Sequence, residues 1–285
     1  MSVPEKVGVL GGGRMGAGIA HAFLLAGAEV VVVERDAASV AAARDRIRHA
    51  VAESVKRGTA SGSFERLESR LVTDVDIDAL AGCDLVIEAV PEEFAVKLDA
   101  LRRVEDAVEP GTPVASNTSS ISIDVLATAL ARPDAFLGLH FFNPVPSSQL
   151  VEIVVGAATD PELTERASGW VTALGKTPIT VRNTPGFASS RLGALLAAEA
   201  IRMLEAGVAS APDIDAAMTL GYKHPIGPLR LTDMVGLDVR LAILEYLHGE
   251  LGDRFEPPAL LRRLVADGKL GRKTGEGFYV WEDAS

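Results

Sequence analysis

The chain has 285 residues, of which 48% are hydrophobic and 24% are charged, and its formal net charge is -11. This balance is that of an ordinary globular protein of two modest domains, contains no apolar run long enough to cross a bilayer, and disfavours nucleic acid or an anionic membrane as a partner. A single cysteine, Cys83, and an amino terminus without the plan of a signal peptide lead us to expect a cytoplasmic protein.

The first part of the chain alternates between short β-forming runs and helical patterns. Apolar runs predict strands at residues 7–10, 30–33, 85–88, 113–116, 136–140 and 150–155. Continuous apolar strands that alternate with helices, such as the helical pattern over 37–57, are typical of a mostly parallel sheet covered on both faces. We therefore predict an α/β domain over residues 1–184.

The character of the sequence changes near Pro185. The Thr184-Pro185-Gly186 step disfavours regular structure, because the residue before proline is restricted and glycine frees the backbone. Long helical patterns rich in Leu, Ala and Ile follow, including residues 191–207. We predict an all-helical second domain over residues 185–285.

A glycine-rich turn directly follows the first predicted strand and opens a helical pattern. Gly11, Gly13 and Gly16 have GxGxxG spacing, which permits a tight turn, close approach of the backbone to a pyrophosphate and close packing of helix on strand. The second strand ends in Glu34, 23 positions after Gly11, where a carboxylate binds the ribose of NAD and repels the 2′-phosphate of NADP. This combination predicts a Rossmann-type NAD site, with a glycine-rich turn that binds no ligand as the alternative.

His140 ends the apolar run 136–140 and is followed closely by two prolines, so it lies where a predicted strand stops. A histidine at a strand end is most often structural, but ligands of parallel sheets bind beyond the carboxyl ends of the strands. Glu152 lies within the apolar run 150–155, where a carboxylate needs a partner. We predict a pair in which Glu152 fixes the ring of His140, and the imidazole takes a proton from an alcohol as hydride leaves for nicotinamide.

Polar residues also follow the predicted strand 113–116. Asn117, Ser119 and Ser120 lie where side chains can reach the same crevice. Serine and threonine before an apolar-periodic run also cap helices routinely, so the residues alone leave both interpretations open.

Several segments together resemble one enzyme family. They are the glycine motif, SNTSS at 116–120, GLHFFNPVP at 138–146, HPIGPLRLTDMVGLDV at 224–239 and LGRKTGEGFY at 270–279. The chain thereby resembles L-3-hydroxyacyl-CoA dehydrogenases, of the short monofunctional kind typified by 3-hydroxybutyryl-CoA dehydrogenases. The resemblance implies reversible, NAD-dependent oxidation of a short-chain (S)-3-hydroxyacyl-CoA to the 3-ketoacyl-CoA. It also implies a homodimer, in which the helical domain serves substrate binding and dimerisation.

The resemblance assigns roles to individual residues. His140 matches the catalytic base, Glu152 its orienting carboxylate, and Ser119 the hydroxyl that contacts substrate and nicotinamide. Ser190 stands where relatives carry an asparagine that reaches the active site, and we expect it to assist Ser119 in binding the substrate oxygen. The positions at which relatives contact NAD are Leu10, Gly11, Gly12, Gly13, Arg14, Met15, Gly16, Glu34, Glu92, Lys97, Asn117, Ser119, Asn143 and Lys273.

Four of the charged residues assigned by the resemblance also have an ordinary structural explanation. Glu92 and Lys97 also fit an ordinary solvated helix. Lys56 and Arg57, assigned to the phosphates of CoA, also fit a solvated helix end. No metal is expected, because the histidines show no paired ligand spacing.

The chain departs from the family pattern at Ser190 and at residues 147–149, which read Ser-Ser-Gln where many relatives are apolar or basic. Two alternative functions follow. One is a related 3-hydroxy acid dehydrogenase of the gulonate or carnitine type, and the other is an NAD-binding structural protein whose catalysis has decayed. The intact Ser119, His140 and Glu152 argue against the second.

Overall fold

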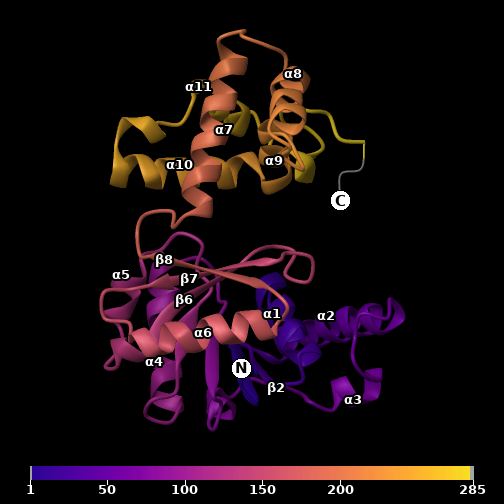
Figure 1. Ribbon diagram of the computed structural model, residues 1–285, viewed down its shortest axis with the longest axis vertical. Helices are drawn as coiled ribbons and strands as arrows, with labels where there is room; N and C mark the ends of the chain where they lie inside the picture. Colours follow the sequence, from indigo (N-terminus) through magenta and orange to yellow (C-terminus); the bar gives the residue numbers. More distant parts are fainter. Residues whose placement is uncertain (1, 283–285) are drawn as a thin grey trace. The chain divides into compact units, whose positions relative to one another are not determined.

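The computed structural model describes residues 2–282, which form two compact units that divide between Thr184 and Pro185. The first unit is an α/β domain built on one sheet, and the second consists mainly of helices (Figure 1). The predicted fold class, a mostly parallel sheet followed by a helical region, is confirmed.

The sheet of the first unit has the strand order β3-β2-β1-β4-β5-β6-β7-β8. Neighbouring strands pair in parallel, except β6 and β7, which are antiparallel. The strands are β1 (Lys6–Leu10), β2 (Glu29–Val33), β3 (Leu71–Asp74), β4 (Leu85–Glu88), β5 (Val114–Ser116), β6 (Phe136–Phe141), β7 (Leu150–Val155) and β8 (Thr177–Arg182).

The apolar pattern predicts neither β3 nor β8, which are the two edge strands. No residue of β8 is fully buried, and Leu71 is the one buried residue of β3. Continuous apolar runs are typical of central strands that are covered on both faces. An edge strand that is partly open to solvent carries polar residues, and its sequence resembles a loop.

Helices cover both faces of the sheet (Figure 1). Val7 and Val9 of β1 share one core cluster with residues of α1, α2 and α6. On the opposite face, α4 contacts β4 and β5, and α5 contacts β6. The helices are α1 (Arg14–Leu25), α2 (Ala37–Lys56), α3 (Phe64–Glu68), α4 (Phe94–Ala107), α5 (Ile123–Ala127) and α6 (Pro161–Ala173).

The second unit has its own apolar core, to which Ala198, Leu237 and Leu244 contribute. Its helices are α7 (Ser189–Glu205), α8 (Ala211–Ala216), α9 (Pro228–Val235), α10 (Leu237–Leu251) and α11 (Ala259–Ala266). None of the helices within residues 2–282 combines the length and the hydrophobicity that a membrane span needs.

Two buried aspartates tie the last part of the chain to the helices of the second unit. Asp233 of α9 accepts hydrogen bonds from the backbone N–H groups of Phe278 and Tyr279 and from Nε1 of Trp281, at 2.9, 3.0 and 2.8 Å. Asp215 of α8 accepts one from the hydroxyl of Tyr279 at 2.7 Å. Burial raises the pKa of Asp233. The segments 224–239 and 270–279 are therefore held together by partly buried hydrogen bonds.

Candidate active site

The glycine turn between β1 and α1 has the conformation that its motif predicts. Gly11 has a φ of +97°, a region that favours glycine. A Cβ at Gly16 would lie 1.7 Å from the carbonyl oxygen of Gly11, so only glycine fits there. A Cβ at Gly13 would meet nothing within 4 Å, and no side chain caps α1 at this residue. An anion can therefore approach the amino end of α1.

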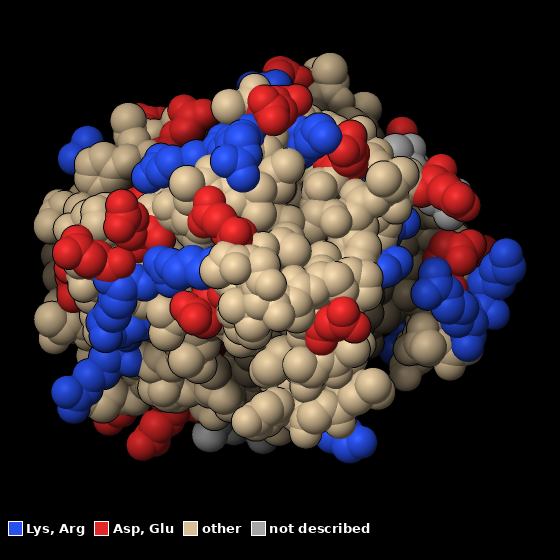
Figure 2. Space-filling model, turned by 90° about the horizontal axis from the view of Figure 1, so that it is seen from above, with Lys and Arg blue, Asp and Glu red and all other residues tan. Residues whose placement is uncertain are grey.

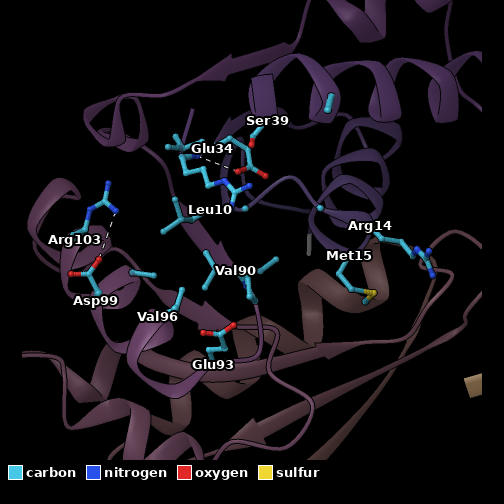
Figure 3. A pocket seen from close by; sticks show the side chains of 18 of the residues that line it. Leu10, Arg14, Met15, Glu34, Ser39, Val90, Glu93, Val96, Asp99 and Arg103 are labelled. Carbon is cyan, nitrogen blue, oxygen red and sulfur yellow. Dashed lines mark hydrogen bonds and ion pairs between the residues drawn. The ribbon is translucent and has the colours of Figure 1, made fainter. Parts of the chain in front are cut away.

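A cavity of about 910 Å³ opens beside this turn. Figure 3 shows the side chains of Leu10, Met15, Glu34 and Val90 around this space. The lining combines apolar side chains and the glycine turn with charged residues of both signs, among them the carboxylates of Glu34, Glu93 and Asp99. Apolar surface together with polar groups suits a nucleotide, which has an apolar base and polar ribose and phosphate groups.

Glu34 follows β2 directly and faces the glycine turn. Its Oε1 accepts a hydrogen bond from the backbone N–H of Gly12 at 2.7 Å, and its Oε2 accepts one from the N–H of Arg35 at 3.2 Å. An ionised carboxylate has about four acceptor sites, so Glu34 retains the capacity to bind the hydroxyls of a ribose. A 2′-phosphate would meet its negative charge.

Lys97 of α4 is a buried cation that lies between two carboxylates. Its side chain is 1% exposed, and its Nζ lies 2.7 Å from Oε1 of Glu88 and 3.2 Å from Oε2 of Glu92. Glu88, the last residue of β4, also accepts a hydrogen bond from the hydroxyl of Ser116 at 2.5 Å. The alternative of an ordinary solvated helix is therefore wrong for Lys97.

Glu92 connects this cluster to the loop that follows β5. Its Oε1 accepts hydrogen bonds from the hydroxyl of Thr118 at 2.6 Å and from the backbone N–H groups of Ser119 and Ser120 at 2.9 and 3.2 Å. Burial opposes ionisation, but the charge of Lys97 and these donors outweigh it, and the pKa of Glu92 lies below its ordinary value. The ionised carboxylate thus fixes the backbone at Ser119.

Asn117 has a different role from the serines beside it. Its Oδ1 accepts a hydrogen bond from the backbone N–H of Phe141 at 2.9 Å, which joins the end of β5 to the end of β6. The residue that caps the following helix, α5, is Ser122. Its side chain accepts a hydrogen bond from the backbone N–H of Val125.

His140 and Glu152 are opposite residues in the antiparallel pair of β6 and β7. The Nδ1 of His140 lies 2.7 Å from Oε2 of Glu152, and the two side chains are 7% and 0% exposed. A carboxylate only accepts hydrogen bonds, so Nδ1 carries the shared hydrogen. The ring of Phe142 packs beside the imidazole with centroids 4.4 Å apart. The pairing predicted from the sequence is therefore present, and the cross-strand register brings the two side chains together.

Three other predicted residues of the first unit lie outside these clusters. Asn143 follows β6 and precedes a cis peptide bond to Pro144. Lys56 and Arg57, at the end of α2, have side chains that are 79% and 69% exposed and lie near the carboxylate of Glu53. Their surroundings are those of a solvated helix end.

In the second unit, Ser190 lies in the first turn of α7. Lys273 binds Asp238 of α10, with Nζ and Oδ1 2.6 Å apart. Within residues 2–282, no group of His, Cys, Asp and Glu side chains is arranged to hold a metal ion.

Neither Glu88 nor Arg240 is predicted from the sequence, although both are buried charged residues. A usable signal existed for Glu88, because it is a carboxylate at the carboxyl end of the apolar run 85–88. Arg240 offers no such signal, since an arginine in an amphipathic helix is ordinarily solvated.

The chain is similar to proteins of known name over nearly its whole length. Residues 6–184 match the family model of the 3-hydroxyacyl-CoA dehydrogenase NAD binding domain, and residues 186–281 match that of the 3-hydroxyacyl-CoA dehydrogenase C-terminal domain. The probable 3-hydroxybutyryl-CoA dehydrogenase of Deinococcus radiodurans is 42% identical, with 97% of this chain and 100% of the relative covered. The 3-hydroxybutyryl-CoA dehydrogenase of Bradyrhizobium diazoefficiens is also 42% identical, with 99% and 97% covered. The crystal structure of (S)-3-hydroxybutyryl-CoA dehydrogenase from Ralstonia eutropha superimposes with a TM-score of 0.94 at 40% identity and covers 98% of this chain and 100% of that one.

Proposed function

The chain belongs to the 3-hydroxyacyl-CoA dehydrogenase family of NAD-dependent oxidoreductases, and we propose that it interconverts a short-chain (S)-3-hydroxyacyl-CoA, 3-hydroxybutyryl-CoA in particular, with the 3-ketoacyl-CoA. The observation that supports this most strongly is the contact of 2.7 Å between the imidazole of His140 and the buried carboxylate of Glu152. A buried carboxylate paired with a histidine at the carboxyl end of a sheet is the arrangement of a general base.

In the oxidation, Nε2 of His140 takes the proton of the 3-hydroxyl group. Glu152 holds the opposite nitrogen, Nδ1, at 2.7 Å and stabilises the imidazolium that forms. A positioned base of this kind contributes about 10²- to 10⁴-fold to the rate. In the reverse reaction, the imidazolium returns the proton to the ketone oxygen.

Bound NAD would supply the acceptor for the hydride that leaves C3 of the substrate. The open space at Gly13 and the uncapped amino end of α1 suit a pyrophosphate, and Glu34 suits a ribose. By resemblance, we assign further NAD contacts to Glu92, Asn143 and Lys273. Lys97 and Asn117 support this site in our proposal by holding Glu92 and the end of β6.

We assign the substrate oxygen to Ser119 and Ser190. The hydrogen bond of 2.9 Å from the N–H of Ser119 to Glu92 supports this assignment, because it fixes the loop that carries the hydroxyl. Removing one such donor costs about 10²- to 10³-fold in kcat. We therefore expect the kcat of Ser119→Ala to fall by that factor when NADH oxidation is measured with acetoacetyl-CoA. The exposed Ser61→Ala is the matched control, and equal rates in both variants would contradict the assignment.

We also assign Lys56 and Arg57 to the phosphates of CoA. This assignment comes from the resemblance, and the two side chains are exposed cations next to each other at the end of α2, where an anion could reach them. The double variant Lys56→Glu and Arg57→Glu should raise KM for acetoacetyl-CoA and leave kcat unchanged. Arg102→Glu with Arg263→Glu introduces the same charge elsewhere, and a KM that rises equally in this control would refute the assignment.

We propose that the second unit mediates a homodimer. Large apolar side chains are exposed on α7, α9 and α10, helices that contact one another. Figure 2 shows one face of the molecule, on which an uncharged area lies between groups of acidic and basic side chains. The exposed apolar side chains of α7, α9 and α10 are those of Leu192, Leu195, Leu231, Met234 and Val239. Sedimentation at micromolar concentration should give a dimer mass, and Leu192→Asp with Met234→Asp should give a monomer. A monomeric wild type would contradict the proposal.

The substrate is tested by measuring NADH oxidation with acetoacetyl-CoA and longer 3-ketoacyl-CoA thioesters, alongside NAD reduction with free 3-hydroxy acids such as gulonate and carnitine. We expect turnover of the thioesters, with acetoacetyl-CoA among the best. Turnover of the free acids alone would favour the gulonate- or carnitine-type alternative. Ser190 is the reason to test this alternative, because it stands where relatives carry an asparagine. Tight NADH binding without turnover of any compound would favour a protein whose catalysis has decayed.

We place the protein in the cytoplasm. The single cysteine, Cys83, is buried as a free thiol, which suits a reducing compartment. Fractionation of cells with an antibody against the chain tests this, and recovery in an extracellular or periplasmic fraction would refute it.

A further inference from the structure

The loop over residues 142–149 joins β6, the strand that carries His140, to β7 and has no regular secondary structure. Most of its residues are exposed, and they include Asn143, which we assign to NAD. Val145 is the one buried residue of the loop, at 2% exposure. An exposed loop is mobile unless contacts with the rest of the fold hold it. The residues that hold this loop therefore decide where Asn143 lies.

On one side, the loop packs against α1. A Cβ at Gly18 of α1 would lie 2.9 Å from Cβ of Val145, closer than real Cβ atoms approach, so Val145 lies directly against the backbone of this helix. α1 begins at Arg14, immediately after the glycine turn that we assign to the pyrophosphate. The loop thus packs against the helix whose amino end belongs to the proposed nucleotide site.

On the other side, Lys176 binds two backbone carbonyl groups of the loop. It lies in the turn between α6 and β8, and its Nζ donates to the carbonyl oxygens of Val145 at 2.6 Å and Ser148 at 2.5 Å. The next residue, Thr177, donates its backbone N–H to the carbonyl oxygen of Gln149 at 2.6 Å. An ammonium group has three N–H donors, so the one side chain of Lys176 can hold both carbonyl groups at once.

The surroundings of Lys176 differ from those of an ordinary surface lysine, which keeps its ammonium group in water. The residue is partly buried, and burial lowers its pKa. Burial also lowers the pKa of His21 of α1, and the charge of Lys176 lowers it further, so the ammonium group is near α1 as well as the loop. Hydrogen bonds from a charged donor are stronger than neutral ones. Lys176 is therefore well suited to hold the loop against α1.

We propose that Lys176 is a positioning residue for the cofactor, which holds the loop 142–149 against α1 and thereby presents Asn143 to bound NAD. This inference rests on the proposed function. Lys176 itself does not contact the nucleotide in this proposal and acts only through Asn143. A loop that is already in place before binding also reduces the entropy cost of ordering it around the ligand.

The test measures the dissociation constant of NADH by fluorescence. Asn143→Ala removes one hydrogen bond and should weaken NADH binding about three- to tenfold. Lys176→Met should weaken it by a similar factor, because the side chain of Asn143 is then no longer held in place. The double variant should bind NADH no more weakly than Asn143→Ala alone, since Lys176 acts through that residue. Effects that multiply in the double variant, or an unchanged dissociation constant in Lys176→Met, would refute the role.

Two further measurements separate positioning from a general loss of structure. Hydrogen exchange followed by mass spectrometry should be faster in Lys176→Met for peptides that cover residues 142–149, and unchanged for peptides of α2. In steady-state NADH oxidation, the KM for NADH should rise by the same factor as the dissociation constant, while the KM for acetoacetyl-CoA stays unchanged. Equal rises in both KM values, or faster exchange throughout the chain, would overturn the role of Lys176.

Lys6→Met is the matched control, because Lys6 of β1 also donates from Nζ to a backbone carbonyl oxygen, that of Ala81, at 2.9 Å. It should bind NADH like the wild type, and equal weakening in this control would refute the role of Lys176. Lys176→Arg keeps the charge and the donors and should restore most of the affinity that Lys176→Met loses. If Lys176→Met does not fold, Lys176→Gln replaces it, and an unchanged dissociation constant in that variant would refute the role.

The role of Lys176 can fail separately from the function on which it rests. Wild-type protein that binds NADH but turns over no 3-ketoacyl-CoA thioester would refute the proposed function, and the dissociation constants would still decide the role. Turnover of acetoacetyl-CoA together with an NADH dissociation constant that is the same in Lys176→Met and the wild type would refute the role alone.

Discussion

Substituting Glu152 by glutamine removes the negative charge beside His140 and keeps the shape of the side chain. Glu152 is 0% exposed, and its Oε2 lies 2.7 Å from Nδ1. The amide oxygen of glutamine can still accept the Nδ1 hydrogen, so the ring stays oriented and only the charge that stabilises the imidazolium is lost. Removing one partner of a buried charge pair costs about 2–5 kcal/mol, and 1.4 kcal/mol is tenfold. We therefore expect kcat to fall about 30- to 4,000-fold.

A double-mutant cycle sharpens this prediction. His140→Ala removes the base and should cost about 10²- to 10⁴-fold in kcat. Because Glu152 acts on the reaction only through His140, the double variant should be no slower than His140→Ala alone. The assay is NADH oxidation with acetoacetyl-CoA at saturation, and NADH binding is measured separately by fluorescence.

The matched control is Glu29→Gln, which changes an exposed glutamate at the start of β2 and should leave the rate unchanged. We expect NADH affinity to stay near normal in every variant of the cycle, because the residues that we propose for binding the nucleotide are other ones. Effects of Glu152→Gln and His140→Ala that multiply in the double variant would refute the reasoning. Near-normal turnover of His140→Ala would refute the catalytic assignment altogether.

Four further predictions test the surroundings of the site. Lys97→Met leaves Glu88 and Glu92 without their shared cation, and since breaking a buried pair costs about 3–5 kcal/mol, calorimetry should show a clearly lower melting temperature. Glu34→Ala should lower kcat/KM for NAD about tenfold, through one lost hydrogen bond to a charged group, and should narrow the preference for NAD over NADP. The pKa of Glu92 lies below its ordinary value of 4.5, so the stability that the ionised carboxylate contributes is present above that pH and is lost as the pH falls. We therefore expect the unfolding free energy of Glu92→Gln to depend less on pH in the acid range than that of the wild type. Burial raises the pKa of Cys83 to about 11, so iodoacetamide at neutral pH should label it slowly in the native protein and rapidly in urea, as followed by mass spectrometry.

Each of these predictions has an outcome that contradicts it. An unchanged melting temperature in Lys97→Met would mean that water compensates the two carboxylates, with the exposed Arg102→Met as the control. If the ratio of kcat/KM for NADP to that for NAD is the same in Glu34→Ala as in the wild type, Glu34 does not select between the two cofactors. Parallel acid denaturation curves for the wild type and Glu92→Gln would contradict the lowered pKa. Rapid native labelling of Cys83 would show that its burial is often relieved by opening of the fold.

The nucleotide half of the site could be predicted because its signals are local. The GxGxxG spacing reflects the backbone of a single turn, as the φ of +97° at Gly11 and the close approach at Gly16 show. Glu34 could be predicted because it ends the strand next to that turn. The central strands could be predicted because burial on both faces requires a continuous apolar run.

The catalytic pair was predicted in part. The cost of burying a carboxylate pointed from Glu152 to His140, and the two side chains do meet. The pattern of apolar runs did not show that β7 reverses direction beside β6, although this antiparallel register sets the two residues opposite each other. A strand that is buried on both faces has a continuous apolar sequence whether it runs parallel or antiparallel to its neighbour, so the sequence does not reveal its direction.

The sequence by itself determined the fold class, the nucleotide turn and the identity of the histidine and its acid, because each depends on residues close together in the chain or on the cost of burying one residue type. Only the tertiary structure decided that Lys97 is buried between two carboxylates, that Arg240 is buried with no hydrogen bond to its Nε from residues 2–282, and that β3 and β8 complete the sheet. A helical lysine or arginine and a polar edge strand look solvated in sequence. Their burial and pairing depend on which distant segments pack against them, and that is a property of the assembled fold.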